Sequence, residues 1–312
     1  MEDRYNIGID IGGTKVNIGI VKDKGEVIDK VKMPVSKEAS YGKVVAEICE
    51  EMKALLLKNN LELEDIYFIG IGVPGTVDVK TGFVTYCPNL YWYDVPIGEM
   101  FKNYLGRDVK IMQDSRNAAL AETLLGAGRK YDNTMCVSIG TGIGCGIIID
   151  RKIFNGGMNT AGELGHTPVV KDGRLCVCGN RGCLERYVSG TGIRDRAIDL
   201  FPEKFKSEEE KCSEYVFELA YQGDKDILAF IDECVDYLAF GIANAVSLLS
   251  PEAIIISGGL CVHEELMINP LREKIMKRGY YAWKKQDKLQ VCKAELGSDA
   301  AMIGAALMYK GL

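Results

Sequence analysis

The sequence predicts an α/β protein of two lobes that arose by internal duplication. The chain has 312 residues, which is enough for two packed lobes, and β-rich runs alternate with helical ones. A unit of strand, glycine-rich turn and strand occurs twice. YNIGIDI and VNIGIV flank GGTK, and TMCVSIGTGIGCGIIID repeats the pattern. We expect two βββαβα-like halves with glycine turns at matching places; a chance similarity of short glycine-rich strings is the other interpretation.

The first half begins with this hairpin, and a third strand follows in VKDKGEVIDKVKMPV. Apolar residues at helical spacing predict a helix over residues 42–60. YFIGIGVPG is then a buried strand that ends in a turn, VKIMQD is another strand, and SRNAALAETLLGAG is a helix that stops at glycine. We expect the N-terminal lobe to cover residues 1–113, joined by a returning C-terminal helix at residues 298–312.

The second half continues from the repeated hairpin into a loop-rich insert at residues 150–190. The acidic run KSEEEK is typical of a solvated helix start, and AFGIANAVSLLS is the clearest helix. PEAIIISGGL is a strand and turn, and SDAAMIGAALMY is a final helix for which Ser298 is the expected N-cap. The larger lobe should cover residues 114–297.

Charge and composition exclude several classes of protein. The net charge of −6 and the pI of about 5.3 give no attraction to phosphate backbones, so we expect neither nucleic acid nor an anionic membrane as a partner. No apolar stretch reaches the ~20 residues of a membrane-spanning helix, and the N-terminal residues lack the signal-peptide pattern. We therefore expect a cytoplasmic protein, in which the odd number of cysteines, eleven, is not a disulfide framework.

The glycines of three turns are candidates for phosphate and nucleotide binding, because glycine lets backbone N–H groups approach phosphate oxygens. The Thr14 hydroxyl adds a donor, and Asp10 at its strand end can hold Mg²⁺ through water. Each turn alone is a weak signal, since a glycine hairpin is more often only a turn. The candidate residues are Asp10, Gly12, Gly13, Thr14, Lys15, Thr141, Gly142, Gly144, Gly258 and Gly259.

The order and spacing of these turns resemble the actin/hexokinase-type ATPase fold, a ribonuclease-H-like fold. In that fold two phosphate loops and an adenosine loop flank a cleft between lobes. The resemblance implies that ATP·Mg²⁺ binds across the two phosphate turns and that a substrate binds at the base of the cleft.

Asp114, in IMQDSRNAALAE, is a candidate catalytic base. It follows a predicted strand and precedes a helix, which places it at the edge of the expected cleft. Phosphoryl transfer to a hydroxyl group needs a carboxylate that accepts the attacking group's proton. An aspartate before a helix is also a common N-cap, and the residue alone leaves that interpretation open.

One histidine and three cysteines predict a zinc site. His166, Cys176, Cys178 and Cys183 form a Cys₃His set within GHTPVVKDGRLCVCGNRGC, and the chain has only two histidines. This donor set suits Zn²⁺ in a closed tetrahedral shell, which leaves no position for an activated water. The zinc should therefore be structural. Buried free thiols are the alternative.

Together these segments resemble the ROK family (repressors, open reading frames, kinases) along nearly the whole chain, most specifically in AGELGH and CVCGNRGCLE. The resemblance implies an ATP-dependent hexose kinase, with Asp114 as the base, O6 of glucose or a related hexose as the acceptor, and a homodimer or higher homo-oligomer. His166 would serve both zinc and sugar, one ring nitrogen for each. The implied sugar-binding residues are Gly75, Asn89, Gln113, Asp114, Glu163, His166 and Glu185.

The sequence departs from the ROK pattern at a few positions. Met112-Gln113 stands where the family has Glu-Asn, Arg116 where a small or amide residue is common, and Asn159 where glycine is frequent. The sugar therefore stays open among glucose, mannose, fructose, allose and an N-acetylhexosamine such as N-acetylmannosamine. Two other classes are a sugar-binding repressor without kinase activity and a scaffold or pseudokinase. The first hairpin begins at about residue 7, which leaves little room for a repressor's helix-turn-helix.

Overall fold

The computed structural model describes residues 3–35, 39–286 and 288–312. Contacts divide the chain into two compact units. The first holds Met1–Cys136, Gly146–Ala161 and Glu295–Leu312, and the second holds Val137–Cys145 and Gly162–Ala294. The lobe boundaries expected after residues 113 and 297 stay predictions.

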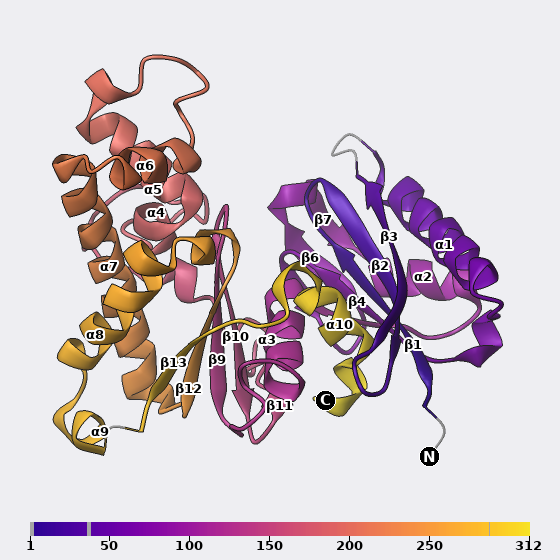
Figure 1. Ribbon diagram of the computed structural model, residues 1–312. Coiled ribbons are helices and arrows are strands. Elements are labelled where there is room, and N and C mark those ends of the chain that lie inside the picture. Colours follow the sequence, from indigo (N-terminus) through magenta and orange to yellow (C-terminus); the bar gives the residue numbers. More distant parts are fainter. Residues whose placement is uncertain (1–2, 36–38, 287) are drawn as a thin grey trace. The chain divides into compact units, whose positions relative to one another are not determined.

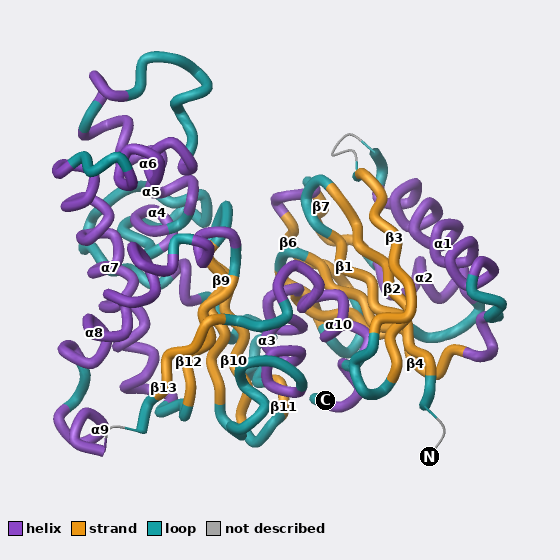
Figure 2. Tube along the Cα trace, in the orientation of Figure 1, coloured by secondary structure: helices purple, strands orange, loops and turns teal. Residues whose placement is uncertain are grey.

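The two large sheets have the same strand order (Figures 1 and 2). The first is β3-β2-β1-β4-β8 and the second is β11-β10-β9-β12-β13. When the strands of each sheet are numbered in chain order, both sheets run third, second, first, fourth, fifth. This shared order confirms the predicted internal duplication, because short glycine-rich strings that match by chance would not impose it. The strands are β1 (Tyr5–Ile11), β2 (Lys15–Lys22), β3 (Val27–Pro34), β4 (Ile66–Val73) and β8 (Lys110–Gln113), then β9 (Thr134–Ile139), β10 (Ile143–Ile149), β11 (Lys152–Ile153), β12 (Ala253–Ser257) and β13 (Gln290–Lys293).

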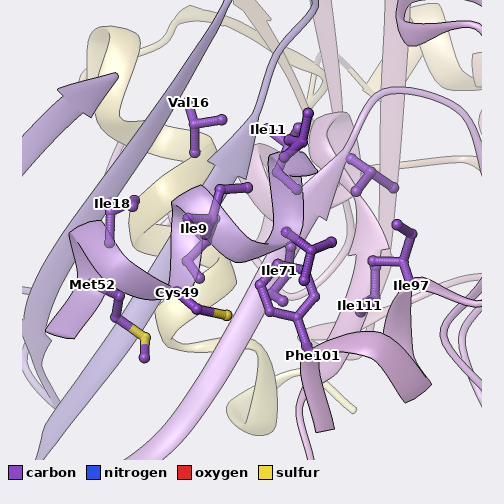
Figure 3. Close-up of a cluster of buried hydrophobic side chains, with 14 of the residues drawn as sticks. Ile9, Ile11, Val16, Ile18, Cys49, Met52, Ile71, Ile97, Phe101 and Ile111 are labelled. Atoms are coloured by element: carbon purple, nitrogen blue, oxygen red, sulfur yellow. The ribbon is translucent and has the colours of Figure 1, made fainter. Parts of the chain in front are cut away.

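Alternating isoleucine and glycine give the first sheet two different faces. Successive side chains of a strand point to opposite faces, so Ile7 and Ile9 share one face and Gly8 lies on the other. The isoleucine face packs against α1 (Tyr41–Lys58) and α2 (Ile97–Leu105), as Figure 3 shows for Ile9, Ile11 and Ile71 with Cys49, Met52 and Phe101.

The glycine face receives α10 (Ala300–Ala306), the helix that returns from the C-terminal end. A Cβ atom on Gly8 would lie 2.0 Å from the backbone oxygen of Met302, and one on Gly70 would lie 1.9 Å from that of Ala305. Only glycine therefore lets α10 approach this closely. The helix α3 (Asp114–Leu124) packs against α10 in turn.

The remaining elements complete each unit. The first unit contains a three-stranded sheet that the sequence reading missed, formed by β5 (Thr76–Asp78), β6 (Phe83–Cys87) and β7 (Trp92–Val95). In the second unit α7 packs against α4, α5, α6 and α8. The helices of the second unit are α4 (Glu185–Val188), α5 (Gly190–Leu200), α6 (Ser213–Tyr221), α7 (Lys225–Leu249), α8 (Asn269–Arg278) and α9 (Tyr281–Gln286).

Two local predictions were wrong. Ser298 is not an N-cap, because it lies inside the 3-10 turn Gly297–Asp299, and Asp299 takes the N-cap position of α10. The acidic run at residues 206–211 starts no helix, because the Glu210 carboxylate accepts hydrogen bonds from the backbone of Lys206 and Ser207 and closes a turn instead. Across the described ranges, no helix has the length and apolarity to cross a bilayer.

Candidate active site and metal centre

The first glycine turn joins β1 to β2 beside a buried carboxylate. The Gly12 N–H donates to the Lys15 carbonyl at 2.8 Å, and Asn17 Nδ2 donates to Asp10 Oδ2 at 3.2 Å. Burial raises the pKa of Asp10, while the Asn17 hydrogen bond and the charge of Lys15 oppose that rise. A Cβ atom on Gly13 would touch Asn89 Cβ at 3.4 Å. The turn predicted for phosphate is therefore a neighbour of the amide predicted for sugar.

Asp114 lies beside the same strand end. It is the first residue of α3, and Gln113 takes the N-cap position, so Asp114 is not the N-cap. Its Oδ1 accepts a hydrogen bond from the Ser115 N–H at 2.6 Å. A Cβ atom on Gly72 would lie 3.5 Å from Asp114 Cα and 3.6 Å from Asp10 Oδ1. The two aspartates therefore flank one glycine of β4.

Asn117 is a polar residue near these aspartates that the sequence reading missed. Its side chain is fully buried, and its Nδ2 would lie 3.1 Å from a Cβ atom on Gly72. Neither amide atom has a hydrogen-bond partner among the described residues, and such buried amides are rare. An asparagine on the buried face of the helix SRNAALAE was the signal available in the sequence.

The Pro74-Gly75 turn lies against the end of β6. Gly75 has φ +141°, and a Cβ atom there would lie 2.2 Å from the Tyr86 carbonyl oxygen, so the turn requires glycine. β6 leads directly into the 3-10 turn Pro88–Leu90, which carries the exposed Asn89. Burial raises the pKa of the Cys87 thiol to about 12, and the negative charge of nearby Asp114 adds to the effect. Gly75, Asn89 and Asp114 thus gather in the first unit.

The second glycine turn joins β9 to β10 and is held from two sides. Within the turn the Gly140 N–H donates to the Gly142 carbonyl at 3.0 Å. Glu185, the first residue of α4, accepts the Ile143 N–H on Oε2 at 2.9 Å. Thr191 in the first turn of α5 donates its hydroxyl to the Thr141 carbonyl at 2.8 Å. Glu185, which the resemblance assigns to sugar, therefore also supports the turn predicted for phosphate.

The third glycine turn lies next to the second. Gly258 follows β12 with φ +93°, and a Cβ atom there would lie 2.4 Å from the backbone oxygen of Ile139, the last residue of β9. Nothing lies within 4 Å of the Cβ position of Gly259. The two turns of the second unit that are predicted to bind nucleotide are thus adjacent. That the turn at residues 12–15 meets them on one triphosphate stays a prediction.

The segment with Glu163 and His166 also packs on the second turn. Glu163 is half-buried and precedes the 3-10 helix Leu164–His166. A Cβ atom on Gly165 would lie 2.6 Å from the Ile143 carbonyl oxygen. Glu185 therefore contacts the N–H of Ile143, and Gly165, the residue before His166, lies against the carbonyl of Ile143.

The four predicted metal ligands come together in the second unit. The ligand atoms of His166, Cys176, Cys178 and Cys183 all lie within 4.8 Å of one another. His166 Nδ1 is 3.6 Å from Cys176 Sγ, and the Sγ atoms of Cys178 and Cys183 are 3.7 Å apart. Tetrahedral zinc with Zn–S of about 2.3 Å and Zn–N of about 2.0–2.1 Å needs separations of about 3.6 Å for N···S and about 3.8 Å for S···S.

The geometry around this cluster also fits zinc. Gly179 and Gly182 have φ of +88° and +78°, which confirms that glycines let the chain turn around the site. Burial raises the pKa of Cys183 to about 12, with the neighbouring thiols adding to the effect. A divalent cation reverses this preference, because a coordinating thiol is deprotonated. Three sulfurs, one imidazole and matching separations therefore fit a closed Zn²⁺ site.

Comparison with known proteins identifies the fold and the family. The crystal structure of a ROK family glucokinase from Streptomyces griseus in complex with glucose and AMPPNP matches with a TM-score of 0.80 and 31% identity, over 97% of this chain and 98% of that one. The fold is thus the ribonuclease-H-like, actin/hexokinase-type ATPase fold that the sequence predicted. The chain belongs to the ROK family, which matches residues 6–311.

Two curated relatives have names that describe different functions, a kinase and a repressor. The glucokinase of Halalkalibacterium halodurans is 31% identical, over 99% of this chain and 96% of its own length. The xylose repressor of Caldicellulosiruptor bescii is 30% identical, over 97% of this chain but 77% of its own length.

Proposed function

We propose that this protein is an ATP-dependent hexose kinase that phosphorylates glucose or a related hexose, with O6 as the acceptor. The observation that carries the proposal is the match to glucokinases over nearly the full length of both chains, at 31% identity. The arrangement of Asp10 and Asp114 around Gly72 supports it, since phosphoryl transfer needs carboxylates near the phosphate turn.

In this proposal the sugar hydroxyl attacks the γ-phosphorus of ATP. A bond forms between the sugar oxygen and phosphorus, the bond from the γ-phosphorus to the bridging oxygen breaks, and ADP leaves. Asp114 accepts the hydroxyl proton and orients the oxygen for in-line attack. Backbone N–H groups of the glycine turns bind phosphate oxygens, and Asn89, Gln113, Glu163 and Glu185 hydrogen-bond to sugar hydroxyls.

Two metals complete the proposal. Mg²⁺, held through water near Asp10, would neutralise charge on the phosphates. Zn²⁺, held by His166 and the three cysteines, would fix the segment between Glu163 and Glu185 in place of a hydrophobic core.

A coupled ADP-release assay over a panel of sugars tests the proposal. The panel contains glucose, mannose, fructose, allose and the N-acetylhexosamines, and phosphorus NMR of the product identifies the phosphorylated hydroxyl. We expect ATP consumption that depends on one or two of these sugars, together with a homodimer in light scattering. ATP consumption that no sugar accelerates would overturn the kinase proposal.

A repressor function has weaker support, because the acidic net charge of −6 disfavours DNA binding. A gel-shift assay with and without sugar separates the two functions.

A further inference from the structure

The loop at residues 155–161, which contains no helix or strand, surrounds the side chain of Arg116. This side chain projects from α3 and is 1% exposed. Nη1 donates to Asn155 Oδ1 at 3.0 Å, and Nη2 donates to the carbonyls of Asn159 at 2.8 Å and Ala161 at 3.0 Å. One guanidinium group therefore binds three positions of the loop at residues 155–161.

The loop closes around this guanidinium. The Ala161 N–H donates to the Asn155 carbonyl at 3.1 Å, which joins the two ends of the loop. Asn159 has φ +58°, a left-handed conformation that asparagine tolerates better than most residues. Arg116 and Asn159 are two of the positions where the sequence departs from the ROK pattern, and the structure shows that they contact each other.

We propose that Arg116 is a positioning residue that sets the affinity for the sugar through this loop. The inference rests on the proposed kinase function, because Ala161 lies two residues before Glu163, a predicted sugar ligand. α3 itself packs against α10 and β4, so loss of Arg116 frees the loop and leaves Asp114 at the helix start. The KM for sugar should therefore change, while kcat and the KM for ATP stay nearly constant.

The test compares Arg116→Met with Asn155→Ala and a matched control, Arg107→Met. Arg107 also donates to three carbonyls of the first unit, those of Leu63, Ile66 and Tyr67, at 2.9, 2.8 and 3.2 Å. We expect Arg116→Met to raise the sugar KM roughly 10- to 100-fold, the range expected when charge-assisted hydrogen bonds are lost. Asn155→Ala should raise it less, and Arg107→Met should lower Tm without changing either KM.

Two further measurements sharpen the result. Free guanidinium at millimolar concentration should restore part of the sugar affinity of Arg116→Ala, which a general loss of stability would not allow. Hydrogen exchange should become faster in residues 155–161 of Arg116→Met and stay unchanged in α3. If Arg116→Met does not fold, Asn155→Ala removes a contact from the loop side alone and decides the matter.

An unchanged sugar KM in both variants, or an ATP KM that rises as much as the sugar KM, would overturn the inference. Loop exchange equal to that of the wild type would overturn the positioning role independently of any activity. A wild-type protein without sugar-dependent turnover would instead overturn the proposed function, and the exchange experiment would still decide whether Arg116 holds the loop.

Discussion

Gly142→Ala is a one-methyl perturbation of the second glycine turn. A Cβ atom on Gly142 would lie 2.5 Å from Glu185 Oε2, whereas ordinary van der Waals contact begins at 3.4 Å. The carboxylate must therefore move by about 0.9 Å. If Oε2 moves away from the Ile143 nitrogen along their hydrogen bond, the distance between these two atoms grows from 2.9 Å to about 3.8 Å. That distance is too long for a hydrogen bond.

The expected magnitude follows from this lost contact. A hydrogen bond to a charged acceptor contributes about 1.5–3 kcal/mol, which corresponds to roughly 10- to 150-fold in kcat/KM if the turn and Glu185 both serve the reaction. Because Glu185 is predicted to bind sugar and supports a predicted phosphate turn, the KM values for sugar and ATP should both rise. The fold should persist, since the clash involves the end of a flexible side chain.

The control is Gly140→Ala in the same turn. Nothing lies within 4 Å of the Cβ position of Gly140, so the same methyl group meets no neighbour. The coupled ADP-release assay, run on both variants over sugar and ATP concentration, should show a large defect for Gly142→Ala and a small one for Gly140→Ala. Equal kcat/KM values for the two variants would refute the link between Glu185 and the turn.

Three further predictions address the base, the metal and the acid stability. Asp114→Asn should lower kcat by about 10²–10⁴-fold with Tm unchanged, and near-normal kcat in the same ADP assay would rule out the base assignment. We expect one zinc ion per chain in the wild type, and Cys178→Ser should lose this zinc and have a higher KM for sugar. Cys212→Ser should change neither the zinc content nor the KM, and metal analysis together with sugar titration measures both. Burial would raise the pKa of Asp23, but hydrogen bonds from Tyr309, Asn6 and Arg4 outweigh it and hold that pKa at about 2. Because the folded pKa is below the ordinary 3.8, Asp23 stabilises the fold by about 2 kcal/mol above pH 4 and loses this effect as the pH falls toward 2. Urea unfolding of Asp23→Asn should therefore differ from the wild type at pH 7 and converge with it toward pH 2, and a pH-independent difference would contradict this.

Local patterns were sufficient to predict most of the fold. The alternation of isoleucine and glycine in YNIGIDI fixes a strand with one large and one small face, and the same pattern in YFIGIGV lets α10 cover both strands. The repeated unit of strand, glycine turn and strand predicted the internal duplication, and the order of strands in the two sheets confirms it. The sheet β5-β6-β7 was not predicted, because its strands are short and separated by turns, which leaves too few residues for a periodic pattern.

The clustering of the four predicted zinc ligands could be read from the sequence, but the contacts among the other candidate site residues could not. The predicted zinc ligands lie within 18 residues of sequence, so their spacing was enough to predict that they come together. The contact of Glu185 with Ile143 spans 42 positions, and Arg116 reaches residues 39 to 45 positions away. Such pairs depend on how separate elements pack, and no local pattern encodes that. The sequence therefore marked Arg116 as a departure from the family without indicating what it binds.

The same contacts explain why metal binding should affect the predicted active site. Cys183 is two residues before Glu185, whose Oε2 accepts the Ile143 N–H, and His166 directly follows Gly165, which lies against the Ile143 carbonyl. Two of the four predicted zinc ligands thus hold the segments that contact Ile143 from its two sides. Neither segment belongs to a long helix or a sheet, so no regular secondary structure would hold these segments in place without the ion. Loss of zinc should therefore displace both predicted sugar carboxylates and the second glycine turn together, as one event.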